Sequence, residues 1–329
     1  MEMRANGIIK VCRLMGLMAL GLCMNNLFSA TAQEKEVPIA FGDMDKWIVR
    51  EIHESKIIGG ATKYLYELGP TDTIVGNIAY QNKGGSPWAN SNVMAKVAGI
   101  VKTNTSVFPE KRGEGSCARL ETRMEKVKVL GIVDIEVVAA GSIFLGKVHE
   151  PIKGTKNPQG MLCTGVPFTN RPKAIRFDYK IKMVPEDYRI RSTGFSRKTK
   201  IAGADSMEVN LFLQKRWEDK EGNVYAKRIG TLVHRFISST DGWVNDATFP
   251  VMYGDITSRP EYEPYMRIQA EERYTVNSEG ESVPIKEIGW AEENEMPTHL
   301  ILQFTSSNGG AYIGSPGNTM WIDNVKLVY

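Results

Sequence analysis

Histidine and cysteine are scarce in this chain of 329 residues, which has four of each. The histidines are scattered, and none stands at ligand spacing from a cysteine, so the sequence offers no zinc site. It also lacks a G-x-S-x-G nucleophile elbow, a complete phosphate-binding loop and an H-E-x-x-H helix. These absences remove the usual sequence signatures of serine hydrolases, nucleotide-binding enzymes and zinc proteases.

Neither sign of charge is in excess. Residues 1–32 carry three of the 41 Lys and Arg and one of the 38 Asp and Glu, so 38 basic and 37 acidic residues remain after them. The densest basic segment, residues 189–200, contains one aromatic residue, Phe195. Grooves for single-stranded nucleic acids combine basic residues with several aromatic ones. We therefore predict a solvated loop in this segment and no nucleic-acid partner.

A hydrophobic run without charged residues and long enough to cross a membrane is missing too, and the candidate for a targeting segment lies near the start. The chain starts with the basic residues Arg4, Lys10 and Arg13. A short apolar run follows at residues 14–22, and the small residues Ala30, Thr31 and Ala32 form a possible cleavage site. The apolar run is too short for a transmembrane segment, so residues 1–32 are predicted to be a secretory signal peptide. Lipidation of Cys23 is the alternative, although Leu22 before it departs from the usual lipobox. We expect export to the periplasm or the cell surface.

No amphipathic helix of ordinary length follows residue 33. Turn-forming pairs such as Gly69-Pro70 and Asp241-Gly242 recur about every ten to twenty residues, and the runs between them are rich in Val, Ile, Tyr, Phe and Thr. This spacing predicts an all-β sandwich. The final run, residues 320–329, follows a Gly/Pro turn and should be a strand paired inside a sheet.

Four runs alternate between apolar and polar residues, and the alternation indicates which side chains share a face of a strand. In the longest, Met207, Val209, Leu211 and Leu213 face one way, and Glu208, Asn210, Phe212, Gln214 and Arg216 face the other. Residues 116–122, 174–181 and 300–305 alternate similarly. If the four strands are neighbours in one sheet, their second faces form one polar surface.

Two segments lack this alternation. Residues 127–145 are almost continuously apolar and predict one strand buried on both faces. Residues 147–170, with three prolines, predict loops that cross from one sheet to the other.

Several phrases together resemble one family. They are WANSN at 88–92, CARLET at 117–122, AAGSIFLG at 139–146, PFTNRPKAIRFDYK at 167–180 and GSPGNTMWIDNVKL at 314–327. In this order they resemble the secreted β-sandwich family described as "putative carbohydrate metabolism domain". The resemblance implies a jelly-roll sandwich similar to galactose-binding and carbohydrate-binding modules, in exported proteins linked to glycan use, and it supplies no catalytic residues. The predicted organisation is a signal peptide (1–32), a linker (33–40) and a single jelly-roll domain (41–329).

A sugar-binding surface needs a flat aromatic ring and planar polar groups that hydrogen-bond adjacent hydroxyls. Trp88 follows a Gly/Pro turn where no periodicity accounts for an indole, and Phe212 is the apolar member of a polar face. The other candidate ligand-binding residues are Asn92, Arg119, Arg176, Asn210, Gln214 and Gln303. The alternative is that Trp88 plugs one end of the sandwich and that the charged groups pair with one another.

Glycoside hydrolysis needs two carboxylates about 5 to 10 Å apart. Glu121, Asp178 and Glu208 lie on the predicted polar faces and are the candidate catalytic residues. No spacing of acids along one strand marks a jelly-roll glycanase, so the sequence gives no positive sign of catalysis.

A structural Ca²⁺ is common near the ends of jelly-roll modules. Asp43, Asp45 and Asp323 are candidate ligands if the first and last strands lie together, whereas Asp323 and Asn324 equally fit a β-bulge. After the signal peptide only Cys117 and Cys163 remain, and export permits a disulfide between them without requiring one.

Together these patterns predict a secreted carbohydrate-binding β-sandwich protein that acts in polysaccharide capture or breakdown. Its expected partners are an oligosaccharide or polysaccharide and other exported glycan-utilisation proteins. The alternatives are a glycoside hydrolase and a structural or adhesion protein of the cell surface.

Overall fold

β-Strands dominate the part of the chain that the structure describes. The computed structural model describes residues 34–329 except 98, 130–132, 154–156, 158 and 195–197. Its helical elements are short 3-10 turns: η1 (Lys56–Ile58), η2 (Gln159–Met161) and η3 (Pro264–Met266). The prediction of an all-β chain is therefore confirmed. The predicted signal peptide and Cys23 lie outside the described residues.

Residues 36–329 form one compact unit. Within the described residues, no helix has the length and apolar character needed to cross a membrane.

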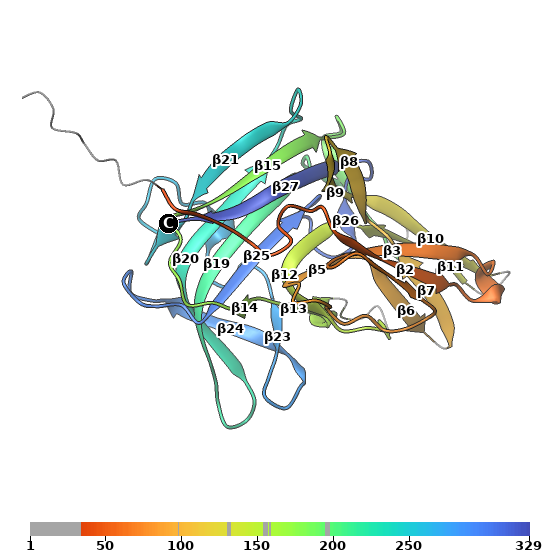
Figure 1. Cartoon of the computed structure of the whole chain (residues 1–329), viewed down its shortest axis with the longest axis horizontal. Coiled ribbons are helices and arrows are strands. Elements are labelled where there is room, and N and C mark those ends of the chain that lie inside the picture. The colour runs from red at the N-terminus through yellow and green to blue at the C-terminus, as the bar shows by residue number, and fades with distance from the viewer. Residues whose placement is uncertain (1–33, 98, 130–132, 154–156, 158, 195–197) are drawn as a thin grey trace, which may run out of the picture. The chain divides into compact units, whose positions relative to one another are not determined.

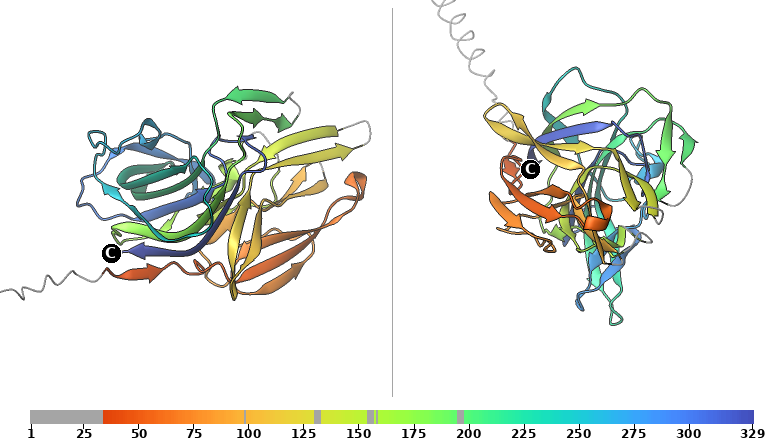
Figure 2. Two further views of the ribbon diagram at one scale, coloured as in Figure 1. Left: turned by 90° about the horizontal axis from the view of Figure 1, so that it is seen from above. Right: turned by 90° about the vertical axis from the view of Figure 1, so that its right-hand side faces the viewer.

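A six-stranded antiparallel sheet contains the end of the chain. Its strands are β1 (Glu36–Pro38), β8 (Val107–Arg112), β9 (Gly115–Glu121), β15 (Ala174–Lys182), β21 (Val244–Pro250) and β27 (Thr319–Val328). β27 lies between β15 on one side and β9 and β1 on the other, as Figure 1 shows. The terminal strand is thus paired on both edges, as the sequence predicted, and Figure 2 shows it next to β1.

A ten-stranded sheet forms the second large layer. Its strands are β5 (Trp88–Asn90), β12 (Ser142–Val148), β13 (Leu162–Thr164), β14 (Val166–Pro167), β19 (Met207–Glu218), β20 (Val224–Phe236), β22 (Met252–Tyr253), β23 (Tyr274–Val276), β24 (Ser282–Trp290) and β25 (His299–Thr305). Because β25 pairs with both β19 and β12, the order β25-β19-β20-β24-β23-β13-β12 closes on itself. We call these strands the closed circuit.

Four small sheets complete the described strands. They are β3 (Thr62–Leu68)-β2 (Trp47–His53)-β4 (Asp72–Val75), β6 (Val93–Val97)-β7 (Ile100–Asn104), β10 (Arg123–Val129)-β11 (Val133–Ala139)-β17 (Thr193–Gly194), and β18 (Thr199–Ala202)-β16 (Tyr188–Arg191)-β26 (Ile313–Gly314).

The two large sheets enclose one hydrophobic core. Its members come from both layers and include Leu120, Phe177 and Ile322 of the six-stranded sheet and Leu211 and Phe304 of the ten-stranded sheet. The four predicted alternations are confirmed, because the residues expected to face inward are those that enter this core: Ala118 and Leu120; Ile175, Phe177, Tyr179 and Ile181; Met207, Val209, Leu211 and Leu213; and Leu300, Leu302 and Phe304.

The prediction of a single buried strand over residues 127–145 is wrong, since this segment spans the end of β10, all of β11 and the first half of β12. The break between β11 and β12 falls at Gly141, where an added Cβ would lie 2.5 Å from the backbone of Glu121 and of Ser106. This close approach is possible only for glycine. β12 is buried over its first five residues, as expected. The segment predicted as loops, 147–170, also contains η2, β13 and β14.

Cys117 and Cys163 are both free and buried, on β9 and β13 respectively, so no disulfide joins them. Burial is the main reason why the pKa of the Cys117 thiol rises to about 12, with Glu110 nearby acting in the same direction.

Candidate functional site

The predicted polar surface is divided between the two large sheets. β9 and β15 belong to the six-stranded sheet and are separated by β27, whereas β19 and β25 are neighbours in the ten-stranded sheet. Because both sheets pack on the same core, their outward faces point in opposite directions. The structure therefore does not bring Glu121 and Asp178 together with Glu208, and the expectation of one continuous polar surface is wrong.

On the six-stranded sheet the charged groups pair with one another. The Arg112 Nη1 donates to Asp178 Oδ2 at 2.8 Å and to Asp323 Oδ2 at 2.6 Å. Burial alone would raise the pKa of Asp178, but hydrogen bonds from Asn324, the Asp246 backbone and Arg112 outweigh it and lower that pKa. Two further predicted ligand-binding residues are also paired here, Arg119 with Glu110 and Glu121, and Arg176 with Glu36.

The predicted calcium ligands do not form a cluster. Asp323 precedes a bulge in β27, where Asn324 has a φ of 53° and the pairing with β15 shifts register, so the bulge alternative is confirmed. Asp45 accepts a hydrogen bond from the Ser116 backbone at 2.7 Å, and Asp43 is exposed. Among the described residues, no group of three or more His, Cys, Asp or Glu side chains could hold a metal ion.

Trp88 offers no face to a sugar. It lies on β5 rather than in a loop, its side chain is buried in the sandwich core, and its Nε1 donates to the Ala40 carbonyl at 2.8 Å. The alternative interpretation, an indole that plugs the sandwich, is the one that the structure supports.

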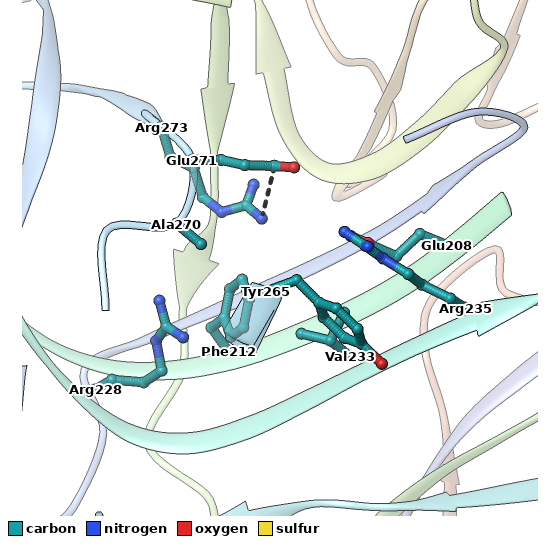
Figure 3. Close-up of a pocket in the computed structure, with 9 residues that line it drawn as sticks. All are labelled: Glu208, Phe212, Arg228, Val233, Arg235, Tyr265, Ala270, Glu271 and Arg273. Carbon is teal, nitrogen blue, oxygen red and sulfur yellow. Dashed lines mark hydrogen bonds and ion pairs between the residues drawn. The ribbon is translucent and has the colours of Figure 1, made fainter. Parts of the chain in front are cut away.

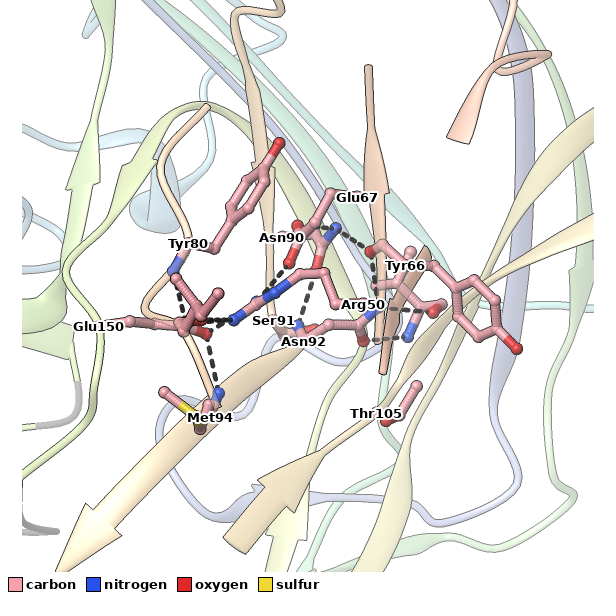
Figure 4. Close-up of polar contacts among 12 residues, drawn as sticks. Arg50, Tyr66, Glu67, Tyr80, Asn90, Ser91, Asn92, Met94, Thr105 and Glu150 are labelled. Atoms are coloured by element: carbon pink, nitrogen blue, oxygen red, sulfur yellow. Dashed lines mark hydrogen bonds and ion pairs between the residues drawn. The ribbon is translucent and has the colours of Figure 1, made fainter. Parts of the chain in front are cut away.

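Asn92 belongs to a buried polar cluster that Figure 4 shows. Its Nδ2 donates to the carbonyls of Tyr66 and Val107 at 2.9 and 2.7 Å. In the same cluster the fully buried Arg50 pairs with Glu67 at 2.9 Å and with Glu150 at 2.5 Å. Burial is the largest of the effects that raise the pKa of Glu67 to about 8. These contacts join segments distant in the chain and give Asn92 a structural role.

The side chains of β19 that face away from the hydrophobic core point into the interior of the closed circuit. Gln214 donates to Glu287 of β24 at 2.6 Å, and Arg216 bonds to Thr164 of β13 and Thr275 of β23. These partners lie on strands across the circuit from β19. We call the surface formed by Glu208, Asn210, Phe212, Gln214 and Arg216, with the side chains of the other strands that meet them, the inner face.

A pocket opens on this inner face (Figure 3). Its lining comes from β19 (Glu208, Phe212), β20 (Arg228, Val233, Arg235) and the segment before β23 (Tyr265, Ala270, Glu271, Arg273). We call residues 254–273, which connect β22 to β23, the strap. The cavity volume is about 10 Å³, which is room for about one water molecule.

A carboxylate, a guanidinium group and an amide meet at Glu208. Its carboxylate accepts hydrogen bonds from Arg235 Nε at 2.9 Å and from Asn210 Nδ2 at 3.1 Å. The Oδ1 of Asn210 is buried without a hydrogen-bond partner. A buried acceptor in this state is costly, and a ligand or a water that donates to it would remove the cost.

Two aromatic rings accompany these polar groups. The guanidinium carbon of Arg228 lies 4.0 Å from the ring centroid of Phe212, and that of Arg273 lies 4.9 Å from it. Arg235 lies 3.9 Å from the centroid of Tyr265, which comes from the strap. The pocket therefore combines a carboxylate, guanidinium groups and aromatic rings.

Five of the predicted site residues share this side of the ten-stranded sheet. Glu208, Asn210, Phe212 and Gln214 lie on β19, and Gln303 of β25 lies 3.5 Å from Arg273 Nη1. Burial would raise the pKa of Glu287 beside them, but its pairing with Arg228 and its hydrogen bonds outweigh burial and lower it. Of the five, Glu208 and Phe212 line the pocket.

Sequence reasoning missed Arg228, Arg235, Tyr265 and Arg273. The pairing of β19 with β20 shifts register between Leu213 and Gln214, so a strict alternation along β20 does not place Arg228 and Arg235 on one face. Tyr265 and Arg273 belong to the strap, where no periodicity marks a direction for side chains. The only sequence feature that marks these four residues as candidates is that they are basic or aromatic.

The chain is similar to two solved structures and matches one protein-family model. A solved structure titled "putative glycoside hydrolase" from Bacteroides thetaiotaomicron is 16% identical, with a TM-score of 0.45, and the match covers 92% of this chain and 98% of that one. A second solved structure with the same description, from Bacteroides vulgatus, is 14% identical, with a TM-score of 0.40. The match covers 90% of this chain and 95% of that one. No curated protein matches the chain. The model of the family described as "Putative carbohydrate metabolism domain" matches residues 71–328, well over half of the sequence, and the chain belongs to this family.

Proposed function

We propose that the protein binds a glycan at the pocket of the inner face and acts, after export, in polysaccharide capture or breakdown. The observation that supports this is the convergence of Glu208, Arg235, Phe212 and Tyr265 in one pocket. Sugars are recognised by aromatic rings that cover their C–H faces and by planar polar groups that bind their hydroxyls. Membership of a carbohydrate-metabolism family points to the same class of ligand.

We infer that the two large sheets are the layers of a jelly-roll sandwich of the kind found in carbohydrate-binding modules. The shared core and the antiparallel order of the six-stranded sheet support this inference. The closed circuit then provides the concave surface on which the glycan binds.

The size of the cavity determines how the glycan would bind. A volume of about 10 Å³ accepts one substituent rather than a whole sugar ring. The ring would therefore remain at the mouth of the pocket, while a hydroxyl or a similar group reaches Glu208 and Arg235.

Glu208→Gln tests the proposal, because it keeps the shape of the side chain and removes its charge. The exported protein and this variant would be compared for retention on a broad glycan array and for melting temperature. We expect about 10-fold weaker retention, as for the loss of one hydrogen bond to a charged group.

Glu121→Gln is the matched control, since Glu121 lies on the outward face of the six-stranded sheet. It should bind like the wild type. Equal retention of the Glu208→Gln variant, or no retention of any glycan by the wild type, would refute the proposed function.

Hydrolysis is the second candidate, because Glu208 and Glu271 line the same pocket. Glycosidases place two carboxylates across the scissile bond, one of them as general acid. If the protein is a hydrolase, release of reducing ends from a bound polysaccharide should be lost in both Glu208→Gln and Glu271→Gln and kept in Glu121→Gln. A wild type that binds a glycan without cleaving it excludes this candidate and leaves the binding function in place.

A further inference from the structure

Four guanidinium groups meet on the inner face, and their charges are unequally matched. Arg228 pairs with Glu287, whose side chain is 7% exposed. Arg235 pairs with Glu208 at 2.9 Å, and the Glu208 side chain is 5% exposed. These two arginines are therefore compensated by carboxylates that are themselves shielded from water.

The other two arginines lack such a partner. Arg216 is buried and forms no ion pair with any described residue; it bonds to Gln214, Thr164 and Thr275. The Arg273 side chain is 12% exposed, and its carboxylate partner Glu271, at 3.4 Å, is 44% exposed. An ion pair with so exposed a partner is weakened by solvent screening.

The inner face consequently holds more buried positive than negative charge. A buried charge without a close partner is costly, and an anion that enters the site would offset that cost. At Arg216, burial is the main cause that lowers the pKa to about 9; the charge of Glu287 opposes it, and the charge of Arg273 lowers the pKa further.

Arg273 is the guanidinium best placed to meet an entering anion. It lines the pocket, whereas Arg216 does not, and its hydrogen bond to Gln303 is long, at 3.5 Å. Its planar fork fits the two oxygens of a carboxylate. A carboxylate is much smaller than a sugar ring and would take the place of the Glu271 carboxylate beside Arg273. The ring of Phe212, 4.9 Å from the Arg273 guanidinium, would then contact the carbons of the sugar ring.

We propose that the pocket selects sugars that carry a carboxylate, as uronic acids do, and that Arg273 binds that carboxylate. The inference rests on the proposed glycan-binding function and gives its ligand class. Glu271 then acts as the group that the carboxylate displaces from Arg273, since both would occupy the same side of the guanidinium.

The test uses uronic-acid oligosaccharides of several linkages, each beside its carboxyl-reduced counterpart, with sulfated oligosaccharides as a third arm. Binding to the exported protein would be measured by calorimetry. We expect each bound acidic oligosaccharide to bind at least about 10-fold more tightly than its reduced form. Arg273→Gln should abolish this preference, and Arg273→Lys should restore part of it, because a lysine keeps the charge without the fork.

Arg123→Gln is the control for a lost positive charge, because Arg123 is exposed on β10, away from the pocket lining. It should keep the preference. Equal binding of acidic and reduced forms, an unaffected Arg273→Gln variant, or preferred binding of sulfated sugars would overturn the assignment of a carboxylate. If reduced glycans still bind and lose affinity in Glu208→Gln, the proposed function stands without this inference; if no oligosaccharide binds, both fail.

Discussion

Trp88 shows how a side chain in a turn-rich sequence can belong to the core. The run Gly84-Gly85-Ser86-Pro87 suggests a loop, but β5 begins at Trp88 and pairs with β12, which brings the indole between the two sheets. Its neighbours along the chain therefore say little about its environment, because β12 is more than fifty residues away.

Replacing Trp88 by alanine should lower the free energy of unfolding by about 3 to 5 kcal/mol, the usual cost of deleting a large buried aromatic. Chemical denaturation measures this change. Glycan binding, measured where the variant is still folded, should be unaltered, because Trp88 is not part of the pocket lining. A variant as stable as the wild type, with weaker glycan binding, would show that the indole is accessible after all.

The strap forms one wall of the pocket. It is attached to β24 through Gln269, whose Oε1 accepts from the Glu287 backbone at 2.8 Å and whose Nε2 donates to the Ile285 carbonyl at 3.4 Å. Arg228 Nη1 of β20 also binds the strap, by donating to the Met266 carbonyl at 2.9 Å. Four of the nine residues that line the pocket come from this segment.

Gln269→Ala should loosen the strap without unfolding the sheets. Two hydrogen bonds of about 1 kcal/mol each are lost, so amide hydrogen exchange in residues 254–273 should become about 30-fold faster while the core strands keep their protection. Glu261→Ala is the control on the same segment, since Glu261 is exposed and makes no hydrogen bond or ion pair with the described residues. Faster exchange throughout the molecule would mean that Gln269 stabilises the whole fold rather than the strap.

The sequence predicted the strands better than it predicted their pairing. Alternation located the core-facing residues of β9, β15, β19 and β25, because period-two patterns are local. It could not tell that β27 separates β9 from β15 or that β12 pairs with β25, since strand order depends on contacts between distant segments. For this reason Glu208, Asn210 and Phe212 were identified as one face, while Glu121 and Asp178 were joined to them wrongly.

For the whole molecule, the buried charges link stability to pH. Arg50 joins β2 to Glu67 of β3 and to Glu150, which follows β12, so two buried carboxylates share one guanidinium. Burial, only partly offset by Arg50, raises the pKa of Glu67 from 4.5 to about 8. Between these values the folded protein binds a proton that the unfolded chain has released, and stability must therefore fall as the pH rises through this window.

The contribution of Glu67 to the free energy of unfolding should decrease by about 2 kcal/mol between pH 6.5 and 8.5, because each unit of pKa shift corresponds to about 1.4 kcal/mol. Denaturant titrations at these two pH values measure the change. Burial lowers the pKa values of His149, His234 and His299, so these histidines act in the opposite direction at the lower end of the window, where they lose a proton in the unfolded chain. Their contribution is the same in the wild type and in the Glu67→Gln variant, so the difference between the two proteins reports Glu67. Glu67→Gln should remove most of the decrease, whereas Glu121→Gln should leave it unchanged. If the Glu67→Gln variant loses stability with pH as steeply as the wild type, the proton belongs to another group, and Arg50 compensates both carboxylates in the folded protein.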